Sequence, residues 1–307
     1  MLVKEDVDTL LGPYETRYFG AGHKKSDYKI SEGTFIKGTY MAIGAVEYDD
    51  NWSKKKERIL EKHLSTIDGI ILSVMLVEKY LLFQKMPIEY INKLFLSSFE
   101  VKAGPESVSN LNILKVKLKK IKVSVTQINV VSCIENMEVK LSFVIDVPSN
   151  SEKYSESVGF IENHLKYKKQ EICNIDFQNK DKMTCSIKQT VEDTDNFHGI
   201  QSSHSTFISI LEWLVSFAQM SQMLAYHYDN IRREDSDNLW MRQVKAVYTK
   251  GINKEENDIE TIGEIIRAKK LSKNEKTWRT FSMSGHDIEN RIFFEAKLAH
   301  QLPEETI

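Results

Sequence analysis

The sequence predicts an α+β fold of two tandem repeats, each an antiparallel sheet wrapped around one long helix. Two long, largely apolar segments begin near His63 and His204, one in each half of the 307-residue chain, and are expected to form the central helices. Other segments alternate apolar and polar residues, which is typical of antiparallel strands with one exposed face. A sheet curled around a helix covers most of its apolar circumference. This arrangement is the double hot-dog fold.

The first repeat, assigned to residues 1–150, is predicted to begin with one or two strands over residues 28–48, which are rich in Tyr, Ile, Phe and Val. The first long helix follows a polar loop, with Ser65 or Thr66 as its N-cap. Segments 115–125 and 138–146 then alternate with period two, and Lys119-Lys120 interrupts the first as a β-bulge does.

The second repeat, assigned to residues 151–307, follows a serine-rich stretch, Pro148 to Gly159, which is the best candidate for a linker. Its central helix is expected from about Ser205 to Tyr228, with the start of each helix marked by a histidine followed by a Ser-Thr pair. Alternation predicts the strands of this half at residues 170–178, 182–191, 240–249, 276–283 and 290–300.

Composition excludes several classes of function. A net charge of -2 gives no overall attraction to nucleic acid or anionic lipid. Charged residues interrupt both apolar segments before the ~20 apolar residues of a membrane span. Three cysteines without close spacing indicate neither a disulfide framework nor a zinc site, and the eight histidines are scattered. We therefore expect a cytoplasmic protein without metal or cofactor, as a monomer or homodimer.

Three blocks of the sequence resemble the bacterial avirulence D (AvrD) family: residues Leu10–Lys25, "WSKK" followed by "HLSTIDGIIL", and "FHGIQSSHST". That family is associated with syringolide-type acyl glycosides. The resemblance implies that a 3-oxoacyl group, carried as a CoA or acyl carrier protein thioester, is joined to a small ketose such as xylulose. The chemistry is similar to that of A-factor synthase-like proteins, which are built from hot-dog repeats. The resemblance assigns no catalytic residue.

Acyl transfer needs donors for an oxyanion and a base for the attacking hydroxyl. The free N–H groups at the start of a helix are such donors, and imidazole is a base suited to neutral pH. His63 and His204 precede the two helices, although each could equally be a capping or loop histidine. Asp195, His198 and Ser205 lie close to His204 in sequence and could orient it.

Two carboxylates and two hydroxyls near the helix starts have both a functional and a structural interpretation. Asp68 could accept a hydrogen bond from a sugar or a histidine, but a carboxylate in a first turn usually complements the helix dipole. Glu212 is either on a polar helix face or held in a pocket. Ser65 and Ser205 are better explained as N-caps than as acyl nucleophiles, because neither lies in a GxSxG motif.

Two further segments are candidate binding sites. The loop 49–56, with Trp52 and Lys54, could dock a phosphopantetheine arm or an acidic carrier protein, although a charged run is often simply solvated. Arg17 and His23 lie in the glycine-containing segment "RYFGAGHKK", which could bind a phosphate or the thioester carrier, without the spacing of a P-loop.

The leading prediction is an acyltransferase-type enzyme that condenses a 3-oxoacyl thioester with a small ketose and so begins the synthesis of a lactone-type signal or elicitor. A dehydratase or thioesterase of the same fold, acting on acyl thioesters without a sugar, is one alternative. A non-catalytic module that binds an acyl lactone is the other.

Overall fold

The computed structural model describes residues 6–50, 52–145, 158–191, 197–252, 256, 258–273 and 275–303. The predicted linker lies outside these residues apart from Val158 and Gly159, and Asp195 lies outside them altogether. Among the described residues, no helix has both the length and the apolar character needed to cross a membrane.

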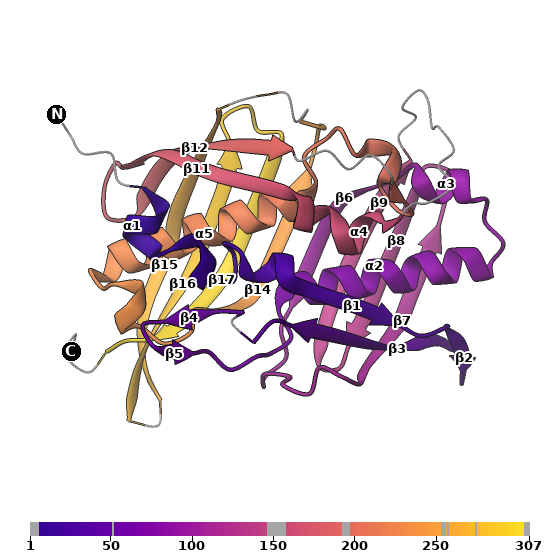
Figure 1. Ribbon diagram of the computed structural model, residues 1–307, viewed down its shortest axis with the longest axis horizontal. Coiled ribbons are helices and arrows are strands. Elements are labelled where there is room, and N and C mark those ends of the chain that lie inside the picture. The colour runs from indigo at the N-terminus through magenta and orange to yellow at the C-terminus, as the bar shows by residue number, and fades with distance from the viewer. Residues whose placement is uncertain are drawn as a thin grey trace.

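In the part of the chain that the structure describes, 13 strands form one large sheet (Figure 1). The strands of the first half are β1 (Ser26–Ile30), β2 (Thr34–Ile36), β3 (Thr39–Tyr48), β6 (Leu94–Lys102), β7 (Leu114–Val123), β8 (Gln127–Ile134) and β9 (Met137–Ile145). Those of the second half are β11 (Lys168–Phe177), β12 (Lys182–Val191), β14 (Trp240–Tyr248), β15 (Ile259–Lys273), β16 (Lys276–Asp287) and β17 (Ile292–Gln301). All neighbours in this sheet are antiparallel, as the alternating pattern predicts.

The two halves are joined through the pairing of β6 with β14. The strand order is β1, β3, β7, β8, β9, β6, β14, β17, β16, β15, β12, β11, and β2 pairs with β3. Counted outward from the central pair of β6 and β14, the first half reads β6, β9, β8, β7, β3, β1 and the second half reads β14, β17, β16, β15, β12, β11. In both halves the strand just after the long helix is at the centre and the first strand is at the outer edge, so the two orders mirror each other. Two small sheets stand apart: the antiparallel hairpin of β4 (Lys54–Lys55) and β5 (Arg58–Ile59), and the parallel pair β10 (Val158–Gly159) and β13 (Phe197–His198).

Two long helices lie on the same face of the sheet, α2 (Thr66–Phe83) over the strands of the first half and α5 (Ile210–Asp229) over those of the second (Figure 1). Both are buried around most of their circumference, as expected for helices that a sheet wraps. Strand β7 buries Leu114, Val116 and Leu118 and turns lysines outward, and its pairing shifts between Leu118 and Lys120, where the sequence predicts a bulge. The large antiparallel sheet and mixed α+β content agree with the predicted class.

The start of α2 is as predicted, but the start of α5 is not. Ser65 caps α2 in a capping box with Asp68, whereas α5 begins at Ile210, with Ser209 and Glu212 forming its capping box. Residues Ser202–His204 form a 3₁₀ turn instead, so Ser205 is not a helix N-cap. Ser65 and Asp68 of α2 thus correspond to Ser209 and Glu212 of α5. The two His…Ser-Thr segments, which the sequence suggested as matching helix starts, do not correspond.

The short elements cross between the halves. Helix α1 (Val7–Leu11) and the β4–β5 hairpin from the first half contact α5 and the loop after it, while α4 (Phe160–Asn163) contacts α2. The backbone N–H of Ile200 donates to Glu78 on α2, at 3.1 Å, and that of Gly199 donates to Asn92 at the end of α3 (Ile88–Asn92), at 2.9 Å. Each half therefore covers the helix of the other.

Candidate active site

A cavity of about 600 Å³ lies where the start of α2 faces the second half. The α2 side supplies His63, Leu64, Ser65 and Thr66. The facing wall comes from α5, from the loop after it and from β14, β16 and β17. The lining includes the aromatic residues Tyr18, Phe19, Trp52, Tyr226, Trp240 and Trp278. A cavity of this size with a mostly apolar wall and a few polar groups is typical of a small-molecule site.

His63 precedes the first residue of α2 by three positions, and its ring contacts two tryptophans. The ring centroids are 5.2 Å from Trp52 and 4.9 Å from Trp240. Nδ1 lies 3.0 Å from the carbonyl oxygen of Glu61, which can only accept a hydrogen bond, so Nδ1 carries the proton in the neutral ring. The other nitrogen, Nε2, is then the atom that can take a proton from a bound hydroxyl.

The first turn of α2 offers backbone donors beside His63. The Ser65 hydroxyl accepts from the N–H of Asp68 at 3.2 Å and lies 2.7 Å from the Tyr18 hydroxyl. Across the described part of the chain, no acceptor contacts the N–H groups of Thr66 and Ile67. Because Thr66 lines the cavity, its free N–H can stabilise negative charge that forms there.

Asp68 lies behind this turn and does not line the cavity. Its carboxylate is fully buried and accepts from the Ser65 N–H at 2.6 Å, from the Tyr28 hydroxyl at 2.9 Å and from the Tyr48 hydroxyl. Burial, and next the negative charge of Asp68, raise the pKa of the Tyr28 and Tyr48 hydroxyls well above the ordinary value, so both stay protonated donors. Asp68 therefore anchors the helix start, which favours the dipole interpretation.

Four cationic side chains line the cavity: Arg17, Lys55, Arg233 and Arg242. The one carboxylate in the lining, among the residues that the structure describes, is the exposed Glu106. Lys55 Nζ donates to the Ser236 hydroxyl at 2.9 Å and to the carbonyl oxygens of Ser236 and Asp237 at 3.2 and 2.6 Å. Burial, and then repulsion by Arg233 and Arg58, lowers the pKa of Lys55 to about 7.

The start of α5 is packed differently from that of α2. His204 is 1% exposed, and its ring centroid lies 5.3 Å from that of Phe95. The Ser209 hydroxyl lies 2.8 Å from Nε2 of His164 and accepts from the N–H of Glu212, whose carboxylate accepts from the N–H of Ser209 at 2.6 Å. Glu212 thus caps the helix, in the interior of the protein.

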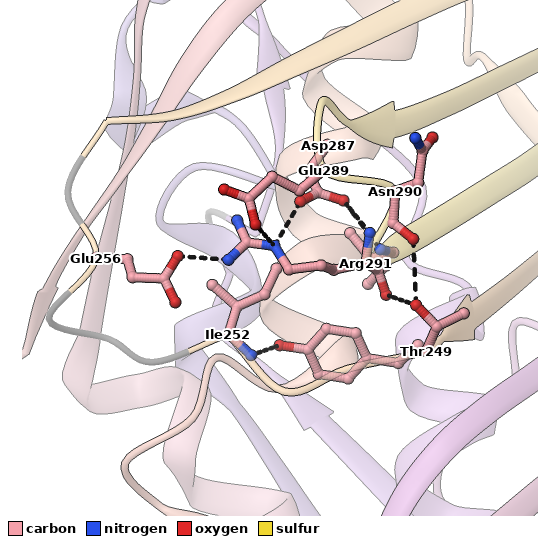
Figure 2. A network of polar contacts seen from close by, with 9 residues as sticks. Thr249, Ile252, Glu256, Asp287, Glu289, Asn290 and Arg291 are labelled. Carbon is pink, nitrogen blue, oxygen red and sulfur yellow. Dashed lines mark hydrogen bonds and ion pairs between the residues drawn. The ribbon is translucent and has the colours of Figure 1, made fainter.

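A polar network holds the loop that covers this second helix start. The N–H of Ile208 donates to the carbonyl of Ile252, and the N–H of Ile252 donates to the Tyr248 hydroxyl, at 2.9 and 2.8 Å. Figure 2 shows Arg291 between Asp287 and Glu256; Nε of Arg291 lies 2.7 Å from the fully buried Asp287 carboxylate. The same carboxylate accepts the backbone N–H of Arg291, so this corner is tied together by charge as well as by packing.

The structure brings only part of the predicted site together. Arg17, Trp52, His63 and Ser65 line the cavity, whereas His23, Lys54, Asp68, His198, His204, Ser205 and Glu212 do not. The imidazole of His23 is buried behind Tyr18, 3.0 Å from its carbonyl oxygen, and burial lowers the pKa of His23 to about 4. His198 lies on β13, near Glu78 and Glu162 on the far side of the interface.

The predicted docking loop is mostly engaged within the chain. Lys56 pairs with Asp235 at 2.6 Å and Arg58 with Asp237 at 3.0 Å, so these charges join the halves at an exposed surface. Lys55, which belongs to the predicted docking loop, also lines the cavity. Sequence reasoning missed four lining residues that supply charge, aromatic wall or hydroxyl contacts: Tyr18, Arg233, Trp240 and Arg242. Within the described residues, no group of three or more His, Cys, Asp or Glu side chains is placed to hold a metal ion.

A structural comparison matches several solved structures at low sequence identity and with TM-scores below 0.5. The tesB protein of Mycobacterium avium subsp. paratuberculosis is 8% identical, with a TM-score of 0.43, over 89% of this chain and 96% of that one. The acyl-CoA thioesterase II TesB2 of Mycobacterium marinum is 8% identical, with a TM-score of 0.41, over 90% and 97%. An acyl-ACP thioesterase of Bacteroides thetaiotaomicron is 10% identical, with a TM-score of 0.43, over 86% and 97%.

A search of curated proteins found no significant match. The family described as Pseudomonas avirulence D protein (AvrD) matches residues 3–303, which is nearly the whole chain and includes all three blocks identified in the sequence. The chain belongs to the AvrD family.

Proposed function

We propose that this protein condenses a 3-oxoacyl thioester with a small ketose such as xylulose, in the cavity at the start of α2. The observation that carries the proposal is that one cavity of about 600 Å³ is lined by both His63 and Thr66, the first residue of α2, whose N–H has no acceptor among the described residues. Membership of the AvrD family supports an acyl glycoside product through the activity that the resemblance implies. The reversed strand order about β6 and β14 supports a double hot-dog, with 1–150 and 151–307 as its repeats.

In the proposed mechanism, Nε2 of His63 removes the proton of a ketose hydroxyl as the oxygen attacks the thioester carbonyl. The carbonyl oxygen becomes an oxyanion, and the N–H of Thr66 donates a hydrogen bond to it. Collapse of this intermediate breaks the C–S bond, and the imidazolium returns its proton to the departing thiolate. The products are the ester and the free thiol, and the histidine is regenerated.

The rest of the cavity suits the two substrates. An acyl chain gains free energy on leaving water, and the wall offers Trp240, Leu239, Met241, Trp278 and Leu298 for it. Ser65, Gln222 and Asn238 also line this space, and their hydroxyl and amide groups are of the kind that hydrogen-bond a sugar. His63 lies beside Ser65 in the lining, where the attacking oxygen would meet the carbonyl.

The test is to incubate the purified protein with a 3-oxooctanoyl thioester and xylulose, and to follow thiol release together with product mass. We expect ketose-dependent thiol release and the mass of the ester or of its cyclised form. Thiol release that is independent of the ketose, with the free 3-oxoacid as product, would instead identify a thioesterase. Tight binding of an acyl lactone with no thiol release from several carriers would identify a binding module.

A further inference from the structure

We propose that the end of the cavity formed by Arg17, Lys55 and Arg233 is a subsite for a phosphate group of a substrate. This inference rests on the proposed function and deepens it, because it states which substrate chemistry the cavity selects. A phosphate could enter on the ketose, as a sugar phosphate, or on the pantetheine arm of the acyl carrier. Both sources present the same anion to the same residues.

The first step of the argument is the balance of charge in the lining. Arg17, Lys55 and Arg233 are each less than 10% exposed, and Arg242 adds a fourth positive charge. The exposed Glu106 supplies the one lining carboxylate found in the described chain. Cations removed from water are costly unless an anion compensates them, so a cavity with this lining favours an anionic ligand.

The second step concerns the partners of the two most unusual cations. Neither Lys55 nor Arg233 forms an ion pair with any described carboxylate. Among the described residues, the ammonium of Lys55 contacts only neutral oxygens: those of Ser236, the carbonyl of Asp237 and, at 3.5 Å, the hydroxyl of Tyr226. The guanidinium of Arg233 donates to the Lys54 carbonyl at 3.0 Å and to the Ser53 hydroxyl at 3.4 Å, which leaves three of its five N–H groups for a ligand.

The third step is that these cations are held in place before a ligand arrives. Arg17 donates to the Gln219 side chain on α5 at 2.8 Å and pairs with Asp8. Ser236 links the other two, because its hydroxyl accepts from Lys55 and donates to the Arg233 carbonyl at 2.8 Å. A rigid set of donors loses little freedom when an anion binds, and guanidinium groups match phosphate geometry.

The burial of Lys55 agrees with this assignment. Burial, and then the neighbouring Arg233 and Arg58, lowers the pKa of Lys55 to about 7, while Asp237 opposes the shift. A phosphate in the cavity would favour the charged ammonium. The cost of burying Lys55 in the free protein is thus recovered when the anion binds.

The experiment is isothermal titration calorimetry on the full chain, with two matched pairs of probes. One pair is xylulose 5-phosphate against xylulose, and the other is 4′-phosphopantetheine against pantetheine. In at least one pair we expect the phosphorylated compound to bind on the order of tenfold more tightly, and the pair that shows it identifies the source of the phosphate. Equal affinity within both pairs overturns the proposal without recourse to any variant.

Variants locate the effect. Lys55→Gln should remove most of the phosphate preference, whereas Lys56→Gln removes an equal charge from the neighbouring exposed residue and should leave the preference intact. A similar loss in both variants would mean that general surface charge attracts the anion, which overturns the subsite. Calorimetry needs no turnover, so the two proposals can fail separately. Product without a phosphate preference overturns this inference alone. A phosphate preference without product, when the activity assay is repeated with xylulose 5-phosphate as the ketose, overturns the condensation alone.

Discussion

Nδ1 of His63 lies 3.0 Å from the carbonyl oxygen of Glu61, and this contact determines which ring nitrogen can act as a base. Replacing His63 with glutamine keeps a polar side chain but removes the proton acceptor. We expect thiol release per folded molecule to fall by roughly 10²–10⁴-fold, the usual contribution of a general base. Initial rates at saturating thioester measure the effect. His286→Gln, a change on β16 outside the cavity lining, should leave the rate unchanged.

The same assay separates His63 from His204. His204 is packed against Phe95 and lies outside the cavity lining, so His204→Gln should lower the melting temperature more than the rate per folded molecule. A variant that folds normally but has lost turnover would return the catalytic role to His204, as one of the sequence-based hypotheses has it.

Lys55 should make the protein more stable as the pH rises. The folded-state pKa of Lys55 is lowered to about 7, mainly by burial, whereas an unfolded lysine has a pKa near ~10.4. Between these values the unfolded chain binds more protons, so the free energy of unfolding increases from about pH 7 to about pH 10. Urea unfolding across this range measures the slope.

Lys55→Met should flatten that slope, because the variant has no buried amine to titrate. The matched change Lys56→Met alters an exposed lysine of the same hairpin and should keep the wild-type slope. An unchanged slope in Lys55→Met would show that another group is responsible for the pH dependence.

The start of α2 can be predicted from the sequence because the residues that specify it are close together in the chain. Ser65 and Asp68 are three residues apart and satisfy each other's backbone N–H groups, so four residues specify the helix start. The same signal, Ser209 followed by Glu212, marks the start of α5. It is easily overlooked because the Ser205-Thr206 pair, directly after His204, resembles the Ser65-Thr66 pair of α2. Strand β15 was missed because its alternation breaks at a bulge between Ile265 and Arg267, which puts Ile266 on the exposed face.

The cationic end of the cavity has no comparable local signal. Lys55 is the middle lysine of "KKK", a run that reads as a solvated surface. Its burial depends on Ser236, 181 residues away in sequence, which the hairpin reaches only because the halves exchange segments. His63 and Ser65 could be proposed from the helix pattern alone. The sequence places Lys55 in a candidate docking loop, but its burial and its position beside Arg233 are known only from the tertiary structure.

Asp229, at the end of α5, is expected to contribute substantially to the free energy of unfolding. Its carboxylate accepts from Arg279 at 2.8 Å and lies 2.9 Å from Nε2 of the fully buried His300. Burial acts to raise the pKa of Asp229, but the bonds from His300 and Arg279 outweigh it and lower the pKa. Asp229→Asn should cost roughly 3 kcal/mol at neutral pH, because it leaves a partly buried arginine uncompensated.

The pH dependence of this effect follows from the direction of the shift. A carboxyl with a lowered folded-state pKa stabilises the protein above its unfolded pKa, near ~3.9, and loses that contribution as the pH falls through the folded value. The difference between wild type and Asp229→Asn should therefore shrink in acid, as measured by urea unfolding. Glu47→Gln, at an exposed pair with Lys29, should cost little at any pH.

The two capping serines should differ in cost although they occupy equivalent helix positions. Removing either hydroxyl leaves a first-turn N–H without its acceptor. The Tyr18 hydroxyl, which lies 2.7 Å from that of Ser65, still has the Asp68 carboxylate at 3.4 Å as an acceptor, so Ser65→Ala should cost about 1 kcal/mol. Ser209 is also a partner of the fully buried His164, at 2.8 Å, and a buried polar group that loses a hydrogen bond adds a further penalty. Ser209→Ala should therefore cost roughly 2–3 kcal/mol in urea unfolding. Equal losses would show that the His164 contact contributes nothing, and would remove the distinction between a cap that borders the cavity and a cap buried in the core.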